Sequence, residues 1–233
     1  MAKKNKLPNL QVTYRGPTFQ GSGHLLGVRQ FFVRFAGCSV KSCHIRRDCD
    51  EQFALKKENG SRVSVRQVID EALEEVGVGG WLHVTGGEPT DQYAGLEALL
   101  QEAQNERLKV HVQSSGTRAL EMPFDWLTIS PKVPARKLEQ TFGHELLLVW
   151  DGHTPEGLRE YMAATRFWYY YLQPKWEGDR ATGGAVSQEE FVQVAHEVSR
   201  QQIAASEGAR HHNAGEWLIT LQAHKYWGDP WMP

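Results

Sequence analysis

The chain has 233 residues, a formal net charge of −2, 40% hydrophobic residues and 23% charged residues. This composition excludes a disordered chain, and no apolar run approaches the roughly 18 residues of a membrane-spanning helix. The balanced charge gives no support for a nucleic-acid-binding surface, and the lysine-rich start is not followed by the apolar stretch of a secretory signal. We therefore expect a cytoplasmic protein that does not act on nucleic acid or at a membrane.

We expect a solvated N-terminal tail over residues 1–12 and one continuous domain over residues 13–233. In chain order, β-forming residues predict a strand over 31–36. Ser64 is expected to cap a helix over 65–76, because apolar residues recur there at helical spacing and glycines follow it. Strands are expected over 81–85 and 108–112, and a helix over 92–106 lies between them.

The remaining expected elements are strands over 126–129, 145–149, 167–172 and 217–221 and helices over 154–165 and 187–206. The alternation of strands and helices in the first half favours an α/β fold with a parallel sheet or barrel. A complete eight-fold barrel typically needs ~250 residues, so we expect a partial, trimmed (β/α) barrel. In such folds the chemistry lies at the C-terminal ends of the strands, where polar, Gly/Pro-rich segments recur in this chain.

The three cysteines, Cys38, Cys43 and Cys49, all follow the first predicted strand within a short segment. An odd number of cysteines without a signal peptide argues against a disulfide scaffold, and their clustering predicts a metal centre. Thiolates suit both zinc and iron–sulfur clusters. Protein-only clusters normally use four cysteines, so three would leave one iron open to a substrate or cofactor. The alternative is a zinc site completed by His44 or another histidine. The spacing leaves both alternatives open.

Two of the motifs, Cys38-x4-Cys43-x5-Cys49 and the TGGEP segment at 85–89, resemble the radical S-adenosylmethionine superfamily, although its usual cysteine spacing is C-x3-C-x2-C. Five segments together resemble the 7-carboxy-7-deazaguanine synthase family within that superfamily. They are GPTFQG at 16–21, VRFAGC at 33–38, TGGEP at 85–89, SPK at 130–132 and LQAHK at 221–225. They occur in family order and span nearly the whole chain.

The resemblance implies that the cysteines hold a [4Fe–4S] cluster whose open iron binds S-adenosylmethionine. It implies a lyase that converts 6-carboxy-5,6,7,8-tetrahydropterin to 7-carboxy-7-deazaguanine with loss of ammonia, in deazapurine biosynthesis of the queuosine type. A homodimer and an electron donor such as flavodoxin or ferredoxin are further family expectations. Two other functions stay open: an activase that makes a glycyl radical on a partner protein, and a non-catalytic zinc- or cluster-binding module.

The resemblance also implies roles for individual residues. Positions that match cofactor-binding residues are Gly86, Gly87, Glu88, Ser130, Pro131, Lys132 and Gln173. Positions that match substrate contacts are Phe19, Gln20, Gly21, Arg34, Thr85, Gln222, His224 and, through its terminal carboxylate, Pro233. Where the family usually has Gly-Glu-Gly, this chain has Gly21-Ser22-Gly23.

A magnesium ligand is also implied. Family members often bind Mg²⁺ through a threonine two residues after the last cysteine, and Glu51 stands at that position. A carboxylate oxygen suits Mg²⁺, just as the guanidinium of Arg34 suits a substrate carboxylate. Without the resemblance, Glu51 would be a surface glutamate, Arg34 an ordinary strand charge and His224 a structural histidine.

Overall fold

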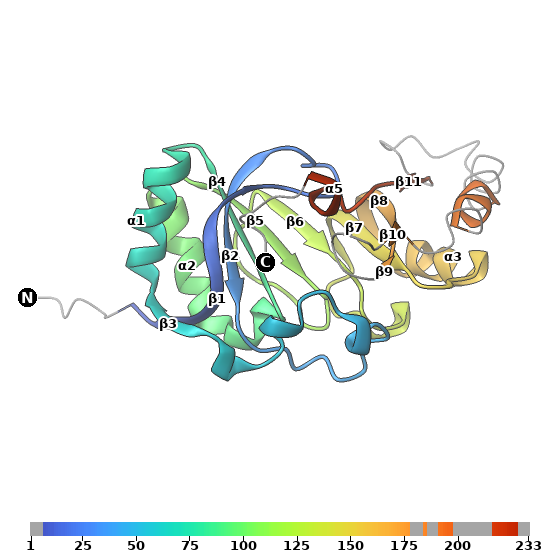
Figure 1. Cartoon of the computed structure of the whole chain (residues 1–233), viewed down its shortest axis with the longest axis horizontal. Coiled ribbons are helices and arrows are strands. Elements are labelled where there is room, and N and C mark those ends of the chain that lie inside the picture. Colours follow the sequence, from blue (N-terminus) through green and yellow to red (C-terminus); the bar gives the residue numbers. More distant parts are fainter. Residues whose placement is uncertain (1–6, 178–183, 186–190, 198–215, 228–233) are drawn as a thin grey trace, which may run out of the picture.

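An open sheet of nine strands, in the order β11-β8-β7-β6-β5-β4-β2-β1-β3, runs through the described part of the chain (Figure 1). The computed structural model describes residues 7–177, 184–185, 191–197 and 216–227. The strands of this sheet are β1 (Asn9–Phe19), β2 (Arg29–Phe35), β3 (Ser61–Ser64), β4 (Trp81–Gly86), β5 (Lys109–Ser114), β6 (Trp126–Ile129), β7 (Phe142–Trp150), β8 (Arg166–Pro174) and β11 (Trp217–Ile219). The pairs from β2 across to β11 are parallel, whereas β1 runs antiparallel to β2 and β3. The expected partial, trimmed barrel is confirmed, since the sheet does not close.

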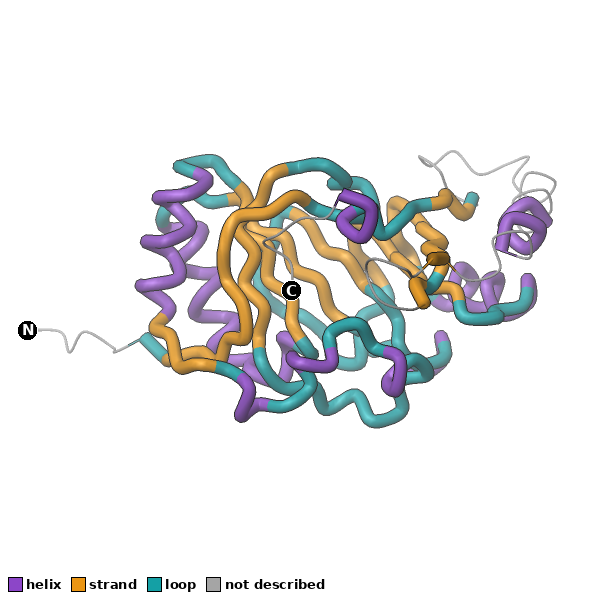
Figure 2. Tube along the Cα trace, in the orientation of Figure 1, coloured by secondary structure: helices purple, strands orange, loops and turns teal. Residues whose placement is uncertain are grey.

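Helices cover the outer face of the sheet (Figures 1 and 2). They are α1 (Val65–Val76), α2 (Tyr93–Asn105) and α3 (Pro155–Ala164). A further short helix, α5 (His224–Trp227), follows β11, and residues 191–197 are also helical. Short 3-10 helices are η1 (Arg46–Asp48), η2 (Gln52–Ala54), η3 (Lys57–Asn59), η4 (Pro89–Gln92) and η5 (Ala135–Lys137). A small second sheet pairs β9 (Trp176–Glu177) with β10 (Gly184–Ala185). None of the described helices is both long and apolar enough to cross a membrane.

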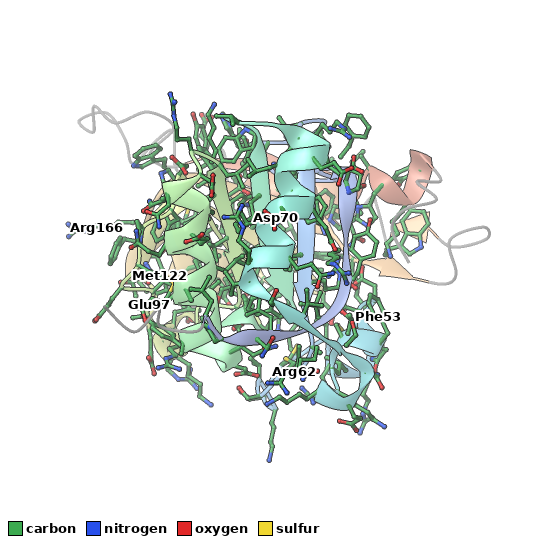
Figure 3. The ribbon with its side chains drawn as sticks, turned by 90° about the vertical axis from the view of Figure 1, so that its left-hand side faces the viewer. Phe53, Arg62, Asp70, Glu97, Met122 and Arg166 are labelled. Atoms are coloured by element: carbon green, nitrogen blue, oxygen red, sulfur yellow. The ribbon has the colours of Figure 1, made fainter. Side chains whose placement is uncertain are left out.

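Helix α1 forms where the sequence predicts it. The hydroxyl of Ser64 accepts a hydrogen bond from the backbone N–H of Gln67 at 3.1 Å, which satisfies one of the unpaired donors of the first turn. Its apolar residues face β1 and β2, and Gly77 ends the helix with φ of 69°. Figure 3 shows α1, which carries Asp70, beside α2, which carries Glu97, both lying across the sheet.

The parallel strands separate two environments because side chains alternate between the faces of a strand. On β2, Phe31, Val33 and Phe35 pack into the hydrophobic core beneath the helices. Gln30 and Arg34 lie on the opposite, inner face. The same alternation on the neighbouring strands gives the inner face polar residues: His83 and Thr85 on β4, His111 and Gln113 on β5, Thr128 on β6 and Glu145 on β7.

The prediction of a solvated tail over residues 1–12 is wrong for residues 9–12. Strand β1 begins at Asn9, and Leu10 and Val12 are 0% and 2% exposed. These two apolar residues are spaced for one face of a strand, and pairing with β3 and β2 buries them. Residues 1–6 lie outside the described part. Of the helix expected over 187–206, residues 191–197 are helical and the others lie outside the described residues.

Candidate active site

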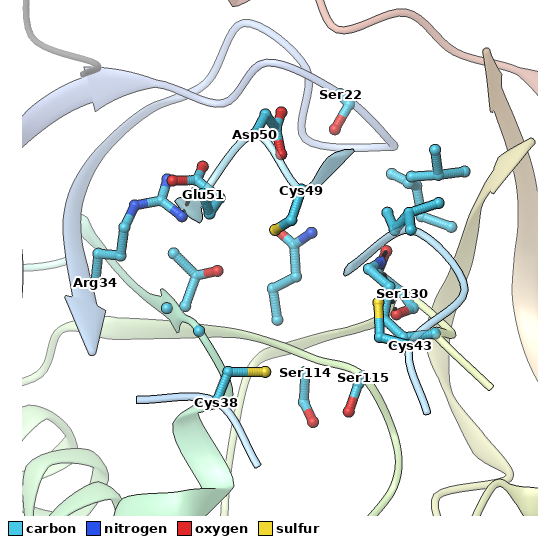
Figure 4. Close-up of a pocket in the computed structure, with 18 of the residues that line it drawn as sticks. Ser22, Arg34, Cys38, Cys43, Cys49, Asp50, Glu51, Ser114, Ser115 and Ser130 are labelled. Carbon is cyan, nitrogen blue, oxygen red and sulfur yellow. Dashed lines mark hydrogen bonds and ion pairs between the residues drawn. The ribbon is translucent and has the colours of Figure 1, made fainter. Parts of the chain in front are cut away.

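Most of the expected site residues line one cavity between the inner face of the sheet and the cysteine loop, which we define as residues 36–60 (Figure 4). Those lining it are Cys38, Cys43, Cys49, Glu51, Gly86, Gly87, Ser130, Lys132, Gln173, Gln20, Gly21, Arg34, Thr85, Gln222 and His224. They come from the ends of β2, β4, β6 and β8, from the connection after β1 and from the segment after β11. The structure thus brings together segments that lie far apart in the sequence.

The three cysteines are half-buried around a common space (Figure 4). Among the described residues, no three His, Cys, Asp or Glu side chains are close enough to hold a single metal ion. The His44 ring is engaged elsewhere, because its Nδ1 lies 3.2 Å from the carbonyl oxygen of Lys132 and its centroid lies 5.3 Å from that of His153. This arrangement does not form the zinc site considered above. Three soft thiol ligands from one loop, with no fourth cysteine in the sequence, fit an iron–sulfur cluster that leaves one iron open.

Burial shapes the chemistry of these thiols. It raises the pKa of Cys38 and raises that of Cys49 to about 11, so both are protonated at neutral pH without a metal. Cluster binding must therefore release protons. Two basic side chains lie near the thiols. An Arg46 nitrogen is 4.0 Å from Cys38 Sγ, and Lys132 is near enough to Cys43 and Cys49 to interact with them electrostatically. Lys132 also donates to the carbonyl and hydroxyl oxygens of Ser130 at 3.0 and 2.6 Å.

Gly87 allows the cysteine loop to lie directly on the end of β4. A Cβ at this position would lie 2.2 Å from the carbonyl oxygen of Gly37 and 2.6 Å from that of Ala54. Gly86 is similarly close to the backbone of Phe35. Both glycines line the cavity, and their immediate role is to let two stretches of backbone approach each other.

Glu88 does not line the cavity, although the resemblance implies a cofactor-binding role for it. Its carboxylate is 1% exposed and accepts hydrogen bonds from the backbone N–H and hydroxyl of both Thr90 and Ser115 and from the hydroxyl of Ser114. Glu88 therefore ties the turn after β4 to the turn after β5. Phe19 and Pro131 also do not line the cavity, and Pro233 lies outside the described residues. Gln113 also lines the cavity and was not predicted. The signal for it is its place on β5, two residues after His111, because residues two apart on a strand face the same side.

Arg34 already holds a carboxylate. Its side chain is 6% exposed, and a guanidinium nitrogen lies 2.8 Å from Glu51 Oε1 (Figure 4). As a result, Glu51 is an ion-pair partner of Arg34 rather than an available ligand. The residues do not form a prepared magnesium site.

The cysteine loop is joined to the segment after β11 through Asp50. Lys225 Nζ and Gln222 Nε2 lie 3.2 and 3.1 Å from Asp50 Oδ2. Burial acts to raise the pKa of Asp50, but the charge and hydrogen bond of Lys225 outweigh it, so the pKa lies below its usual value. Asp50 is therefore a carboxylate at neutral pH and keeps both partners.

The connection after β1 meets the same C-terminal segment. The backbone N–H of Ala223 donates to the carbonyl oxygen of Gly21 at 2.8 Å. A Cβ on Gly21 would lie 2.1 Å from His224 Nδ1, so the histidine packs directly on the glycine. The expected substrate contacts from the two ends of the chain therefore form one wall of the cavity.

The chain is similar to known proteins over most of its length. The chain is 29% identical to the 7-carboxy-7-deazaguanine synthase of Caulobacter vibrioides over 225 residues, which cover 91% of this chain and 95% of the relative. It is 31% identical to the 7-carboxy-7-deazaguanine synthase of Bacteroides thetaiotaomicron over 157 residues, 67% of this chain and 77% of the relative. The crystal structure of QueE from Escherichia coli has the same fold, with a TM-score of 0.64, 18% identity and coverage of 93% of this chain and 95% of that chain. No family model matches the chain. The identity and coverage shared with these relatives show that the chain belongs to the 7-carboxy-7-deazaguanine synthase family.

Proposed function

We propose that this protein is a radical S-adenosylmethionine lyase that converts 6-carboxy-5,6,7,8-tetrahydropterin to 7-carboxy-7-deazaguanine with loss of ammonia. The observation that carries the proposal is one cavity that joins three thiols of a single loop to a buried arginine already paired with a carboxylate. The names of the relatives, which match most of the chain, support the same activity.

The residues that we assign to the cofactors line the cavity together. When bound, a [4Fe–4S] cluster with S-adenosylmethionine supplies the radical chemistry that starts the reaction. Cys38, Cys43 and Cys49 would hold the cluster. Ser130, Lys132, Gln173 and the backbone of Gly87 line the cavity with them and are the residues we assign to S-adenosylmethionine.

Arg34 is the residue we assign to the carboxylate of the pterin. A guanidinium presents a planar fork of N–H donors that matches a carboxylate, and the contact of Arg34 with the carboxylate of Glu51 supports this assignment. Substrate binding would then replace Glu51 at Arg34 with the substrate carboxylate. Gln20, Thr85, Gln222 and His224 supply polar groups around the remaining space.

We extend the proposal to the assembly that the family resemblance implies: a cytoplasmic homodimer that receives electrons from a donor such as flavodoxin or ferredoxin.

The test is an anaerobic reconstitution followed by reduction and addition of S-adenosylmethionine, with and without the pterin. We expect 7-carboxy-7-deazaguanine by mass spectrometry only when the pterin is present. Formation of 5′-deoxyadenosine without consumption of pterin would refute the synthase activity. Stoichiometric zinc without iron would refute the radical chemistry as well. Cys43→Ala should abolish turnover, while Ser42→Ala, an exposed neighbour in the same loop, should retain it.

A further inference from the structure

Glu145 is a buried carboxyl group that the reaction described above does not use. It lies on β7, is 0% exposed and does not line the cavity. Its Oε1 is 2.7 Å from the hydroxyl oxygen of Thr128, and its Oε2 accepts the backbone N–H of His24 at 2.8 Å. A buried carboxyl group lowers the stability of the fold unless hydrogen-bond partners compensate for its loss of water.

The connection that Glu145 contacts is the one that carries two candidate substrate residues. We call residues 20–28, between β1 and β2, the 20–28 loop. Within it, Gly23 has φ of 73°, and a Cβ there would lie 2.5 and 2.8 Å from the two carboxyl oxygens of Glu145. The backbone N–H of Gly23 also donates to Thr220 Oγ1 at 2.9 Å. The loop backbone therefore rests directly on Glu145, while Gln20 and Gly21 of the same loop line the cavity.

The hydrogen bonds behind Glu145 fix its protonation state. His111 Nδ1 is 3.1 Å from Gln30 Oε1, which only accepts, so this nitrogen carries a hydrogen. Burial lowers the pKa of His111 to about 3, so the ring is neutral and its Nε2 has no hydrogen. Because Nε2 lies 2.8 Å from Thr128 Oγ1, the hydroxyl gives its one hydrogen to His111. The contact between Thr128 and Glu145 then needs a hydrogen from Glu145.

With the Thr128 hydrogen placed on His111, Glu145 is a neutral carboxylic acid that donates to Thr128 and accepts from His24. Burial raises the pKa of Glu145 and outweighs its hydrogen bonds with His24, Thr128 and Trp126, which act to lower it. Glu88 is a useful contrast, because five donor groups surround its carboxylate and leave no acceptor to which it could donate.

We propose that Glu145, as a neutral carboxylic acid, is a positioning residue that holds the 20–28 loop in place and thereby places Gln20 and Gly21 against the substrate. The effect on the substrate rests on the proposed function, whereas the attachment of the loop does not. Glu145 would act through the loop and would not itself touch the substrate.

The test compares two substitutions of similar size. In Glu145→Gln, the amide can donate to Thr128 and accept from His24, so it reproduces the neutral acid. Glu145→Met keeps the length of the side chain and removes both hydrogen bonds. We expect Gln to retain the wild-type KM for the pterin and Met to raise it tenfold or more with a smaller change in kcat. Glu139→Ala, an exposed site, is the control and should change neither.

Hydrogen exchange supplies a readout that does not depend on turnover. We expect the amide of His24 to exchange at least tenfold faster in Glu145→Met but at the wild-type rate in Glu145→Gln, with the amides of α1 unchanged in both. If Met does not fold, Gly23→Ala tests the contact from the loop side, since its Cβ meets the same carboxyl oxygens, and it should give the same rise in KM and in exchange.

Two results would overturn the proposal. If Gln disturbs the loop as much as Met, Glu145 does not act as a neutral acid. If Met, or Gly23→Ala in its place, leaves the exchange of the His24 amide unchanged, Glu145 does not hold the loop. Failure of the wild-type protein to convert the pterin would instead refute the proposed function, and exchange alone would then decide the role of Glu145.

Discussion

At the scale of single residues, the absence of one Cβ at Gly87 decides how the cysteine loop lies. Gly87→Ala should reduce the iron bound per chain after anaerobic reconstitution to a small fraction of the wild-type value. The added Cβ would lie 2.2 Å from the Gly37 carbonyl oxygen, and both atoms it meets belong to backbone that cannot rotate away. The loop must therefore shift, and Cys38 shifts with it. Iron analysis and the absorbance of the cluster measure the effect.

Gly157→Ala is the control for this substitution. Its Cβ would meet only the Thr154 hydroxyl at an ordinary 3.7 Å, within helix α3. Iron content should be unchanged, and the free energy of unfolding should stay constant or rise by up to about 1 kcal/mol, as for glycine replaced by alanine in a helix. Equal loss of iron in both variants would show that the contact of Gly87 with the loop does not control cluster binding.

Arg34 allows a second test at this scale. Arg34→Lys keeps the charge but loses the planar fork, so we expect KM for the carboxylated pterin to rise about 10–100-fold, equivalent to about 1.4–2.8 kcal/mol, while kcat changes less. Arg29→Lys on the same strand is the control, because its exposed side chain pairs with Glu75 away from the cavity. An unchanged KM in Arg34→Lys would remove Arg34 from the substrate site.

At the scale of elements, the inner faces of β4 and β5 place two histidines against each other. His83 and His111 are both 0% exposed, and their rings stack with centroids 3.8 Å apart. Burial lowers the pKa of His111 to about 3 and that of His83 well below its usual value. Both rings are therefore neutral in the folded protein at any pH at which the protein would be handled.

The pair predicts a loss of stability in acid. A histidine whose pKa is lowered by folding stabilises the protein above its unfolded value near 6.5 and loses this contribution as the pH falls towards the folded value. Between pH 7 and pH 5, His111 should lower the free energy of unfolding by about 2 kcal/mol, and His83 acts in the same direction. His83→Phe should reduce this acid-dependent loss. Urea unfolding at both pH values measures it, and an identical pH dependence in the variant would contradict the assignment.

The sequence predicts well the elements in which the pattern of apolar residues matches the pattern of burial. The strand over 126–129 and the helix over 65–76 have the predicted bounds, because burial and local signals such as the Ser64 cap act together. Strand β1 was missed: only a few of its residues are buried, and it contains Gly16 and Pro17, which resemble a turn. Its pairing with β3, which follows the cysteine loop, joins segments distant in the sequence, and local patterns do not reveal such a pairing.

At the scale of the whole molecule, the short strand β11 brings the C-terminal segment to the cavity. Trp217 on β11 is 3% exposed and its ring lies 5.5 Å from that of Tyr170 on β8. Trp217→Ala should lower the free energy of unfolding by about 3–5 kcal/mol and raise the substrate KM, because Gln222 and His224 follow this strand. Trp168→Ala, 59% exposed on β8, should have little effect on either. If Trp217→Ala lowers stability without raising KM, β11 does not position the cavity wall.

The sequence predicts which segments build the site better than it predicts what each side chain does there. Motifs at strand ends converge because parallel strands share one edge, so Thr85 and Ser130 could be placed together without a structure. Glu88 could not be distinguished from a cavity residue, since its five donors come from turns after two different strands. The pairing of Glu51 with Arg34 was equally hidden, because it depends on how the cysteine loop folds back over β2.

The two halves of the cavity wall are separated by most of the chain, and this has a consequence for synthesis. Chains emerge from the ribosome at about 5–20 residues per second, so Cys49 emerges roughly 9–35 s before Gln222. During that interval the cysteine loop exists while the segment that pairs with Asp50 does not. In a nascent chain the side of the cysteine loop that carries Asp50 therefore stays open until Gln222 and Lys225 emerge and cover it.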